Sequence, residues 1–275
     1  MSLNIPNHLL DSAKNGSLIP FIGAGFSKVF NLPTWSELIA DVSNQIGYDP
    51  EVAQLYGDFL QLAEFLSIKQ NGLSRFKSAL IHDFNSPTIN ISDSEAHTLL
   101  TKMKLSKIYT TNWDNLLERT FEHHEIPYNK LVTIEDFQES NLDNTSIVKF
   151  HGDLTSSDES LVFTESSYFE RLSFESPLDI SLRSDMIGNT LLFLGYSLSD
   201  WNIRYMWFKL QKLLDEQAYN KNNRDPYAYI VLTKSNPIFE EICKKSRGIG
   251  IIHLDPNNIQ NSMIDLLKKI VNYIE

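Results

Sequence analysis

Short apolar runs, separated by polar and glycine-containing stretches, recur along this chain of 275 residues. Most of these runs are followed by apolar residues at helical spacing. An alternation of buried strands and amphipathic helices is typical of a doubly wound parallel sheet. We therefore predict an α/β fold with a six-stranded parallel sheet flanked by helices. The predicted strands are Leu18–Ile22, Lys107–Thr110, Ile147–Phe150, Leu191–Gly195, Ala228–Leu232 and Ile249–Leu254.

The chain between the first two predicted strands shows helical periodicity and no strand. Trp35, Leu38, Val42 and Ile46 recur at helical spacing, and similar patterns continue to about Ile81. We expect a helical insertion over about residues 48–100. A second segment, about residues 155–188, is rich in Ser, Glu and Phe and is predicted to form helices and loops beside the sheet. Residues 1–275 are interpreted as one domain.

The composition narrows the function classes. The chain is 42% hydrophobic and 21% charged, as in ordinary globular proteins, and its net charge of -11 argues against direct binding of nucleic acid. Its single cysteine, Cys243, excludes an internal disulfide and a cysteine-based zinc site within one chain. No apolar run reaches membrane-spanning length and no signal peptide is evident. We expect a cytoplasmic protein that binds neither nucleic acid nor membranes directly.

Small and polar residues follow four of the predicted strands. Because ligands of parallel sheets gather beyond the carboxyl ends of the strands, we expect these residues to meet at one edge. Glycines in the first turn permit a close approach by a ligand, and a helix that starts there directs N–H groups at a pyrophosphate. The residues are Gly23, Ala24, Gly25, Phe26 and Ser27, then Thr111, Asn112 and Asp114, then His151, and finally Gly195, Ser197 and Asp200.

Each of these residues also has a plain structural explanation. Asn112, Asp114 and Asn115 are residue types that cap helices, as is Asp200. His151 equally suits a buried, hydrogen-bonded position at a strand end, and Gly-x-Ser is common in ordinary turns. Their joint occurrence in this order is what favours a site.

The ordered motifs Gly-Ala-Gly-x-Ser, Thr-x-Asn-x-Asp, His-Gly and Gly-x-Ser resemble those of the sirtuin superfamily. The context 149–153 and the segment 161–168 resemble the prokaryotic, zinc-free branch, which includes NAD-hydrolysing effectors of antiphage defence. The resemblance extends from Pro20 to about Leu254. It implies a Rossmann-like sheet and a single sirtuin-like catalytic domain over residues 1–275.

The resemblance also implies roles for the strand-end residues. His151 matches the catalytic histidine of the family, and Asn112 and Asp114 match residues beside the nicotinamide ribose. The expected NAD-binding residues are Gly23, Ala24, Gly25, Phe26, Ser27, Thr111, Gly195, Ser197 and Asp200. NAD is expected as the substrate, with no metal.

Two departures from the deacylase sirtuins favour water as the acceptor. Their four-cysteine zinc module cannot form here, and residues 31–37 lack the arginine of their Ile-Pro-Asp-Phe-Arg segment. We therefore predict an NAD hydrolase that yields nicotinamide and ADP-ribose. The alternatives are a zinc-free deacylase or ADP-ribosyltransferase, and a module that senses NAD or ADP-ribose without catalysis.

An uncontrolled NAD hydrolase would kill its host. By analogy with the family we expect activity to be gated by homo-oligomerisation or by a partner. The expected partner is an ATPase of the HerA type or another phage-sensing subunit.

Overall fold

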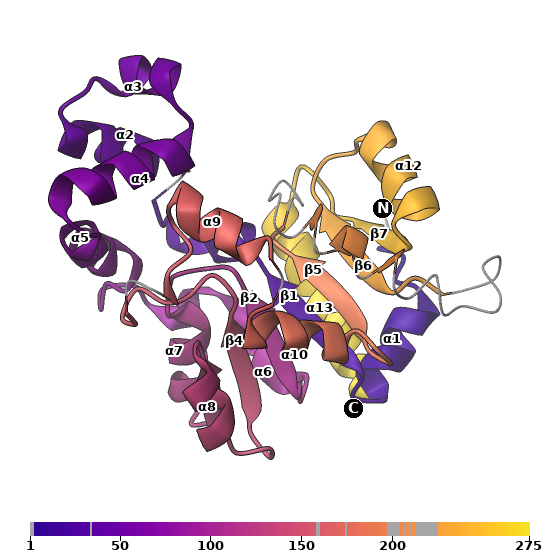
Figure 1. Ribbon diagram of the computed structural model, residues 1–275. Coiled ribbons are helices and arrows are strands. Elements are labelled where there is room, and N and C mark those ends of the chain that lie inside the picture. The colour runs from indigo at the N-terminus through magenta and orange to yellow at the C-terminus, as the bar shows by residue number, and fades with distance from the viewer. Residues whose placement is uncertain are drawn as a thin grey trace.

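The computed structural model describes residues 3–33, 35–157, 160–173, 175–196, 204–205, 207–209, 211–212 and 225–275. A parallel sheet in the order β3-β4-β2-β1-β5-β6-β7 forms its centre (Figure 1). The strands are β1 Leu18–Ile22, β2 Lys107–Thr110, β3 Tyr128–Leu131, β4 Thr145–Lys149, β5 Thr190–Leu194, β6 Ala228–Leu232 and β7 Ile249–His253. The α/β class and the parallel sheet are thus confirmed.

The prediction of six strands is one strand short. The additional strand is β3, which pairs only with β4 and forms an edge of the sheet. Its side chains are mostly half-buried or exposed, and Asn129 and Lys130 interrupt its apolar pattern. An edge strand needs no continuous apolar run, so the pattern that identifies buried strands does not detect it.

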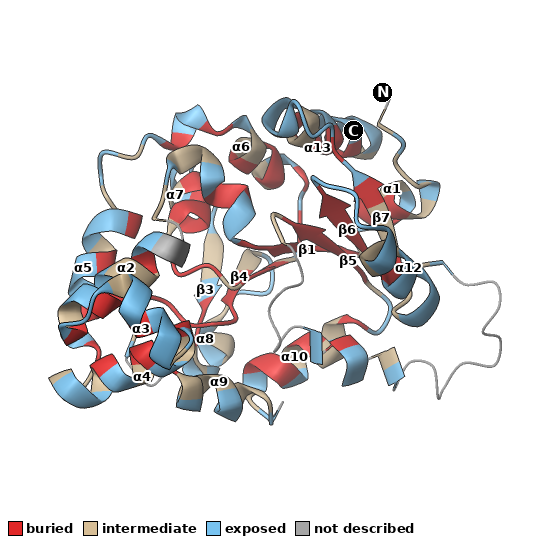
Figure 2. Cartoon of the chain, turned by 90° about the horizontal axis from the view of Figure 1, so that it is seen from above, coloured by how far each residue is buried: buried red, intermediate tan, exposed pale blue. Residues whose placement is uncertain are grey.

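Helices cover both faces of the sheet. Their bounds are α1 Asn7–Lys14, α2 Trp35–Ile46, α3 Pro50–Tyr56, α4 Phe59–Gln70, α5 Ser74–Phe84, α6 Glu95–Lys102, α7 Leu116–His123, α8 Ile134–Glu139, α9 Glu165–Arg171, α10 Pro177–Asp185, α12 Pro237–Ser246 and α13 Ile259–Ile274. Two short 3₁₀ helices are η1, Ala24–Phe30, and η2, Ile91–Asp93. Figure 2 shows buried strands between a layer containing α1, α6 and α13 and a layer containing α10.

The central strand β1 contributes side chains to both layers. Leu18 and Ile22 belong to the core beneath α1, α6 and α13, whereas Ile19 and Phe21 belong to the core beneath α10 and α12. All five residues of β1 are buried. Alternation of side chains therefore places apolar groups on both faces, as expected for the middle of a parallel sheet.

A third core joins α2, α4 and α5 to the loops at the carboxyl edge of the sheet. Phe76 of α5 packs against Phe163 with ring centroids 4.7 Å apart, and Phe163 packs against Trp113 at 5.2 Å. Leu154 and Leu161 belong to the same cluster. The helices between β1 and β2 are thus packed directly onto the segments that follow β2 and β4.

Asp58 stabilises the start of α4 through a capping box. Its carboxylate accepts hydrogen bonds from the N–H groups of Leu60 at 2.9 Å and Gln61 at 3.1 Å. We expect Asp58→Ala to lower the free energy of unfolding by about 1 kcal/mol in urea denaturation, because two N–H groups lose their acceptor. Asp83→Ala, which removes an exposed carboxylate paired with exposed His82, is the control and should change little. Equal effects of the two substitutions would contradict this role of Asp58.

Candidate active site

The turns that follow β2 and β4 start at the same level of the sheet. Thr110 is in register with Ile22 of β1 on one side and with Lys149 of β4 on the other. Asn112 and His151 therefore each lie two residues beyond the paired ends of neighbouring strands. The structure thus places these two predicted residues at one edge of the sheet.

The glycine turn after β1 contacts the end of β5. The N–H of Gly23 donates to the carbonyl of Leu194 at 2.9 Å, and the N–H of Gly25 donates to the carbonyl of Gly195 at 3.0 Å. A Cβ at Gly25 would lie 2.8 Å from the Gly195 carbonyl oxygen, too close for any larger residue. Ala24 and Gly25 are exposed, so a ligand can approach the backbone of this turn. The 3₁₀ helix η1 begins within this turn, at Ala24.

Ser27, Asn112 and Asp114 form a buried hydrogen-bonded group. The carboxamide of Asn112 donates to the Ser27 hydroxyl at 3.3 Å, and both side chains lie near enough to the Asp114 carboxylate to lower its pKa. None of the three is more than 8% exposed. Burial raises the pKa of Asp114 above its ordinary value, against the opposing effects of Lys149 and these hydrogen bonds. The group holds the carboxamide in one place.

The polar side chains after β2 differ in whether they bond to the start of α7. Asp114 accepts a hydrogen bond from the N–H of Leu116 at 3.1 Å, in the first turn of α7, and so satisfies one of the free N–H groups of that helix in addition to its place beside Asn112. The N–H of Asn115 donates to the side chain of Asn85 at 3.1 Å. Asn112 makes its side-chain bond to the turn after β1 instead, which the capping interpretation does not explain.

His151 is held in a turn that only glycine can complete. Its carbonyl accepts a hydrogen bond from the N–H of Val162 at 3.0 Å. Gly152 has φ +81°, and a Cβ there would overlap the carbonyl oxygen of Ser160. The imidazole is 6% exposed and meets Tyr168 of α9 edge to face, with centroids 5.8 Å apart. Tyr168 was not singled out from the sequence, although it lies in the segment 161–168 that resembles the family.

Two of the predicted NAD-binding residues have side chains that contact other residues of the protein. Phe26 belongs to the turn, but its ring is buried in the core against His97, with centroids 4.6 Å apart. Only its backbone therefore borders the strand ends. Thr111 is half-buried and its hydroxyl donates to the phenol oxygen of Tyr196 at 3.5 Å. Two further predicted residues lie outside the described residues: Ser197 and Asp200.

A buried ion cluster next to the site was not predicted from the sequence. Lys149 is fully buried, and its ammonium pairs with Glu118 at 3.2 Å and with Asp153 at 3.5 Å. The only sequence signal is a lysine among the apolar residues of the predicted strand Ile147–Phe150, where a charged residue is unusual unless it is paired. The cluster adds charged groups directly beside the turn of His151.

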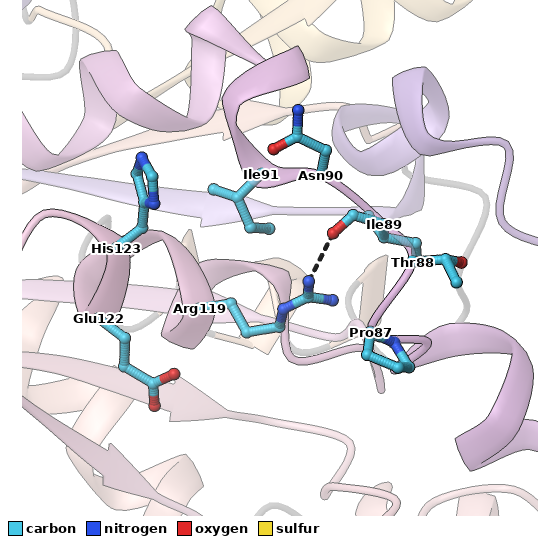
Figure 3. A pocket seen from close by; sticks show the side chains of 8 residues that line it. All are labelled: Pro87, Thr88, Ile89, Asn90, Ile91, Arg119, Glu122 and His123. Carbon is cyan, nitrogen blue, oxygen red and sulfur yellow. Dashed lines mark hydrogen bonds between the residues drawn. The ribbon is translucent and has the colours of Figure 1, made fainter.

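A surface pocket of about 510 Å³ lies away from the strand ends (Figure 3). It is lined by the second half of α7 and by the loop 87–91. Arg119 donates from its guanidinium to the carbonyls of Ser86 at 3.0 Å and Ile89 at 2.5 Å. The guanidinium thus holds the loop 87–91 against α7. None of the predicted site residues lines this pocket.

Neither a metal centre nor a membrane span is found in the part of the chain that the structure describes. No group of three or more His, Cys, Asp or Glu side chains there is arranged to hold a metal ion. No helix there combines the length and apolar character needed to cross a bilayer.

Along the sheet edge the order is His151, Asn112, the glycine turn and Gly195, and a comparison with known protein families covers three of these four positions. A model described as a SIR2-like domain matches residues 106–252, more than half of the chain. The chain belongs to the SIR2-like family. The resemblance inferred from the motifs is confirmed, and the match contains β2 and β4 with the turns that carry Asn112 and His151.

Curated relatives of this SIR2-like chain come from several bacteria. It is 24% identical over 270 residues to the NAD(+) hydrolase ThsA of Bacillus cereus (strain MSX-D12), covering 93% of this chain and 54% of that protein. It is 26% identical over 218 residues to the ThsA of Acinetobacter baumannii (strain 532279), covering 76% and 43%. Defense-associated sirtuin 2 of Bacillus subtilis is 26% identical over 253 residues, covering 89% and 24%. The chain therefore spans about half or less of the length of these relatives.

The SIR2-like fold is also found by comparison with solved structures. The crystal structure of a Sir2 homolog–NAD complex aligns with a TM-score of 0.50 and 11% identity, covering 99% of this chain and 96% of the other. At this identity the likeness establishes the fold.

Proposed function

We propose that this chain hydrolyses the nicotinamide–ribose bond of NAD, releasing nicotinamide and ADP-ribose. Relatives along most of its length are named NAD(+) hydrolase and defense-associated sirtuin. The observation that carries the proposal is the buried group of Ser27, Asn112 and Asp114, placed level with His151 on the neighbouring strand end. The chain acts as a single sirtuin-like catalytic domain, and its biological role is antiphage defence by NAD depletion in the cytoplasm.

The reaction requires little more than positioning and electrostatics. The N-glycosidic bond breaks with its electron pair leaving on the nicotinamide nitrogen, and positive charge develops on the ribose. The oxygen of a water molecule then bonds to the ribose carbon, and His151 accepts the proton that the water releases. Asn112 binds the ribose hydroxyls or orients the water. Asp114 orients Asn112 and, when ionised, stabilises the cation from a buried position where charge interactions are strong.

The remaining predicted residues are assigned to the rest of NAD. The exposed backbone of Ala24 and Gly25 suits the pyrophosphate, because no large side chain blocks a close approach. The N–H groups of Gly23 and Gly25 already donate to carbonyls at the end of β5, so the expectation that they bind the phosphates is not carried over. Gly23 is buried and contributes the shape of the turn. Phe26 contributes backbone only. The other residues assigned to NAD are Ser27, Thr111, Gly195, Ser197 and Asp200.

We further propose that access to the site is gated. Asn112 is 8% exposed and His151 is 6% exposed, so both side chains must gain exposure before a dinucleotide contacts them. Tyr168 of α9 lies against the imidazole and is one group that has to move. Homo-oligomerisation or a partner supplies the trigger, the partner being a HerA-type ATPase or another phage-sensing subunit. Light scattering combined with the NAD assay tests gating by assembly, and a fully active monomer would contradict it.

The activity is tested by incubating the purified chain with NAD and separating the products by chromatography. We expect nicotinamide and ADP-ribose in equal amounts, without any added peptide, because water is the acceptor. A parallel sample receives an acylated peptide. Release of nicotinamide only in that sample would identify a deacylase. If calorimetry detects binding of NAD while chromatography shows that the NAD stays uncleaved at every protein concentration tested, the chain is a sensing module.

A further inference from the structure

A lysine side chain is fully buried two residues before His151. Lys149 is the last residue of β4, and its side chain is 0% exposed. Lysine is almost never buried completely unless its charge is paired, because an ammonium group is costly to remove from water. The partners of this ammonium therefore indicate its role.

The ammonium of Lys149 binds three separate segments. It donates a hydrogen bond to the backbone carbonyl of Asp114, in the turn after β2. It pairs with Glu118 of α7 at 3.2 Å and with Asp153, in the turn after β4, at 3.5 Å. Burial lowers the pKa of Lys149, but the surrounding carboxylates outweigh burial and raise it, so the ammonium stays charged.

Two of these partners adjoin the proposed catalytic residues. Asp114 follows Asn112 by two residues, and Asp153 follows His151 by two residues. The ammonium thus joins the turn that carries the carboxamide to the turn that carries the imidazole. The two turns are otherwise parts of different strand–loop units.

Stability alone does not account for a charge at this position. Apolar side chains of similar volume often replace a buried ion pair with no loss of stability, or with a gain. What an apolar side chain cannot supply is directional bonding to two turns at once. We propose that Lys149 is a positioning residue that fixes Asn112 relative to His151; this inference rests on the proposed function.

The test uses one single and one double variant. Lys149→Met leaves the carboxylate of Glu118 buried without its cation, so the fold is expected to lose stability. The double variant Lys149→Met/Glu118→Gln removes both charges, while Asp153 keeps Lys130 at 3.6 Å. We expect the double variant to recover most of the melting temperature but to retain a kcat for NAD cleavage about 10- to 100-fold below the parent, as small misplacements of reacting groups produce. The KM for NAD should change less than kcat, because the polar partners of Lys149 lie in α7 and in the turns after β2 and β4, away from the turn assigned to the pyrophosphate.

Lys107→Met is the matched control. Lys107 is a strand lysine with 21% side-chain exposure, paired with Asp185 at 2.6 Å, but at the opposite end of β2 from Asn112. Its replacement should lower the melting temperature and leave kcat unchanged.

Hydrogen exchange gives a second readout that needs no activity. We expect faster amide exchange in residues 112–114 and 151–153 of the double variant, and not in the rest of the sheet. Recovery of kcat together with the melting temperature, or unchanged exchange in both turns, would overturn the positioning role. A parent protein that does not cleave NAD even when assembled or supplied with candidate partners would refute the proposed function instead, and the exchange measurement would still decide the role of Lys149.

Discussion

Replacement of His151 by alanine is expected to lower the rate of NAD cleavage about 10²- to 10⁴-fold while the protein remains folded. The imidazole is the proton acceptor proposed for the attacking water, and no other histidine lies in the turns that follow β1, β2, β4 and β5 among the described residues. A loss of this size corresponds to about 3 to 5 kcal/mol of transition-state stabilisation. Initial rates of nicotinamide release, measured on variants of matched purity, provide the test.

Controls separate the chemistry of His151 from its packing. The ring is buried against Tyr168, so its removal also creates a cavity, and circular dichroism and a melting curve must accompany the rates. His151→Asn keeps a polar side chain that cannot serve as the base and should be as slow as the alanine variant. His8→Ala removes a half-buried histidine of α1, outside the site, that contacts Tyr229 of β6, and it should leave the rate unchanged.

Asn112→Ala tests the other proposed catalytic residue, which lies after the neighbouring strand β2. Its loss removes the carboxamide from the group with Ser27 and Asp114, and we expect a rate reduction in the same range as for His151→Ala. Folded variants of both residues that cleave NAD at the parent rate would contradict the assignment of the site.

Gly195→Ala is expected to damage the contact between β5 and the glycine turn. Gly195 has φ +65°, and a Cβ there would overlap the backbone nitrogen of Phe26 and lie 2.8 Å from the carbonyl carbon of Gly25. The alanine therefore has to push the glycine turn away from β5 and break the hydrogen bond between Gly25 and Gly195. We expect NAD binding, measured by calorimetry, to fall together with the free energy of unfolding.

Gly188→Ala is a matched control for the free-energy cost of placing a residue with a Cβ in a left-handed backbone conformation. Gly188 has φ +89°, and a Cβ there meets no atom within 4 Å. This variant should lose only the roughly 1–2 kcal/mol that a left-handed conformation costs a residue with a Cβ. Gly195→Ala should lose about another 1–3 kcal/mol from overlap with its neighbours. Equal unfolding midpoints for the two variants would contradict a tight contact between β5 and the glycine turn.

The buried strands could be predicted from the sequence because their apolar runs are continuous. The same reasoning misses β3, where Asn129 and Lys130 occupy an edge that needs no such run. The predicted bounds of β1, β2 and β6 agree with those observed, whereas those of β4, β5 and β7 differ by one or two residues. Local pattern thus identifies what is buried on both faces and not what is half-exposed.

The site could be predicted only as far as the residues at strand ends. Parallel strands bring Asn112 and His151 to one edge whatever their separation in the chain. The direction of a side chain depends instead on its neighbours in space, so the burial of the Phe26 ring against His97 could not be foreseen. The three-way bonding of Lys149 was hidden for the same reason, since its partners lie in two other segments of the chain.

Trp113 stands between Asn112 and Asp114 in the chain, yet its ring belongs to the core shared with α4 and α5. The indole is 8% exposed and packs on Phe163, which in turn packs on Phe76. Because Trp113 connects this core to the segment that carries Asn112 and Asp114, the packing of α4 and α5 contributes to the position of both side chains.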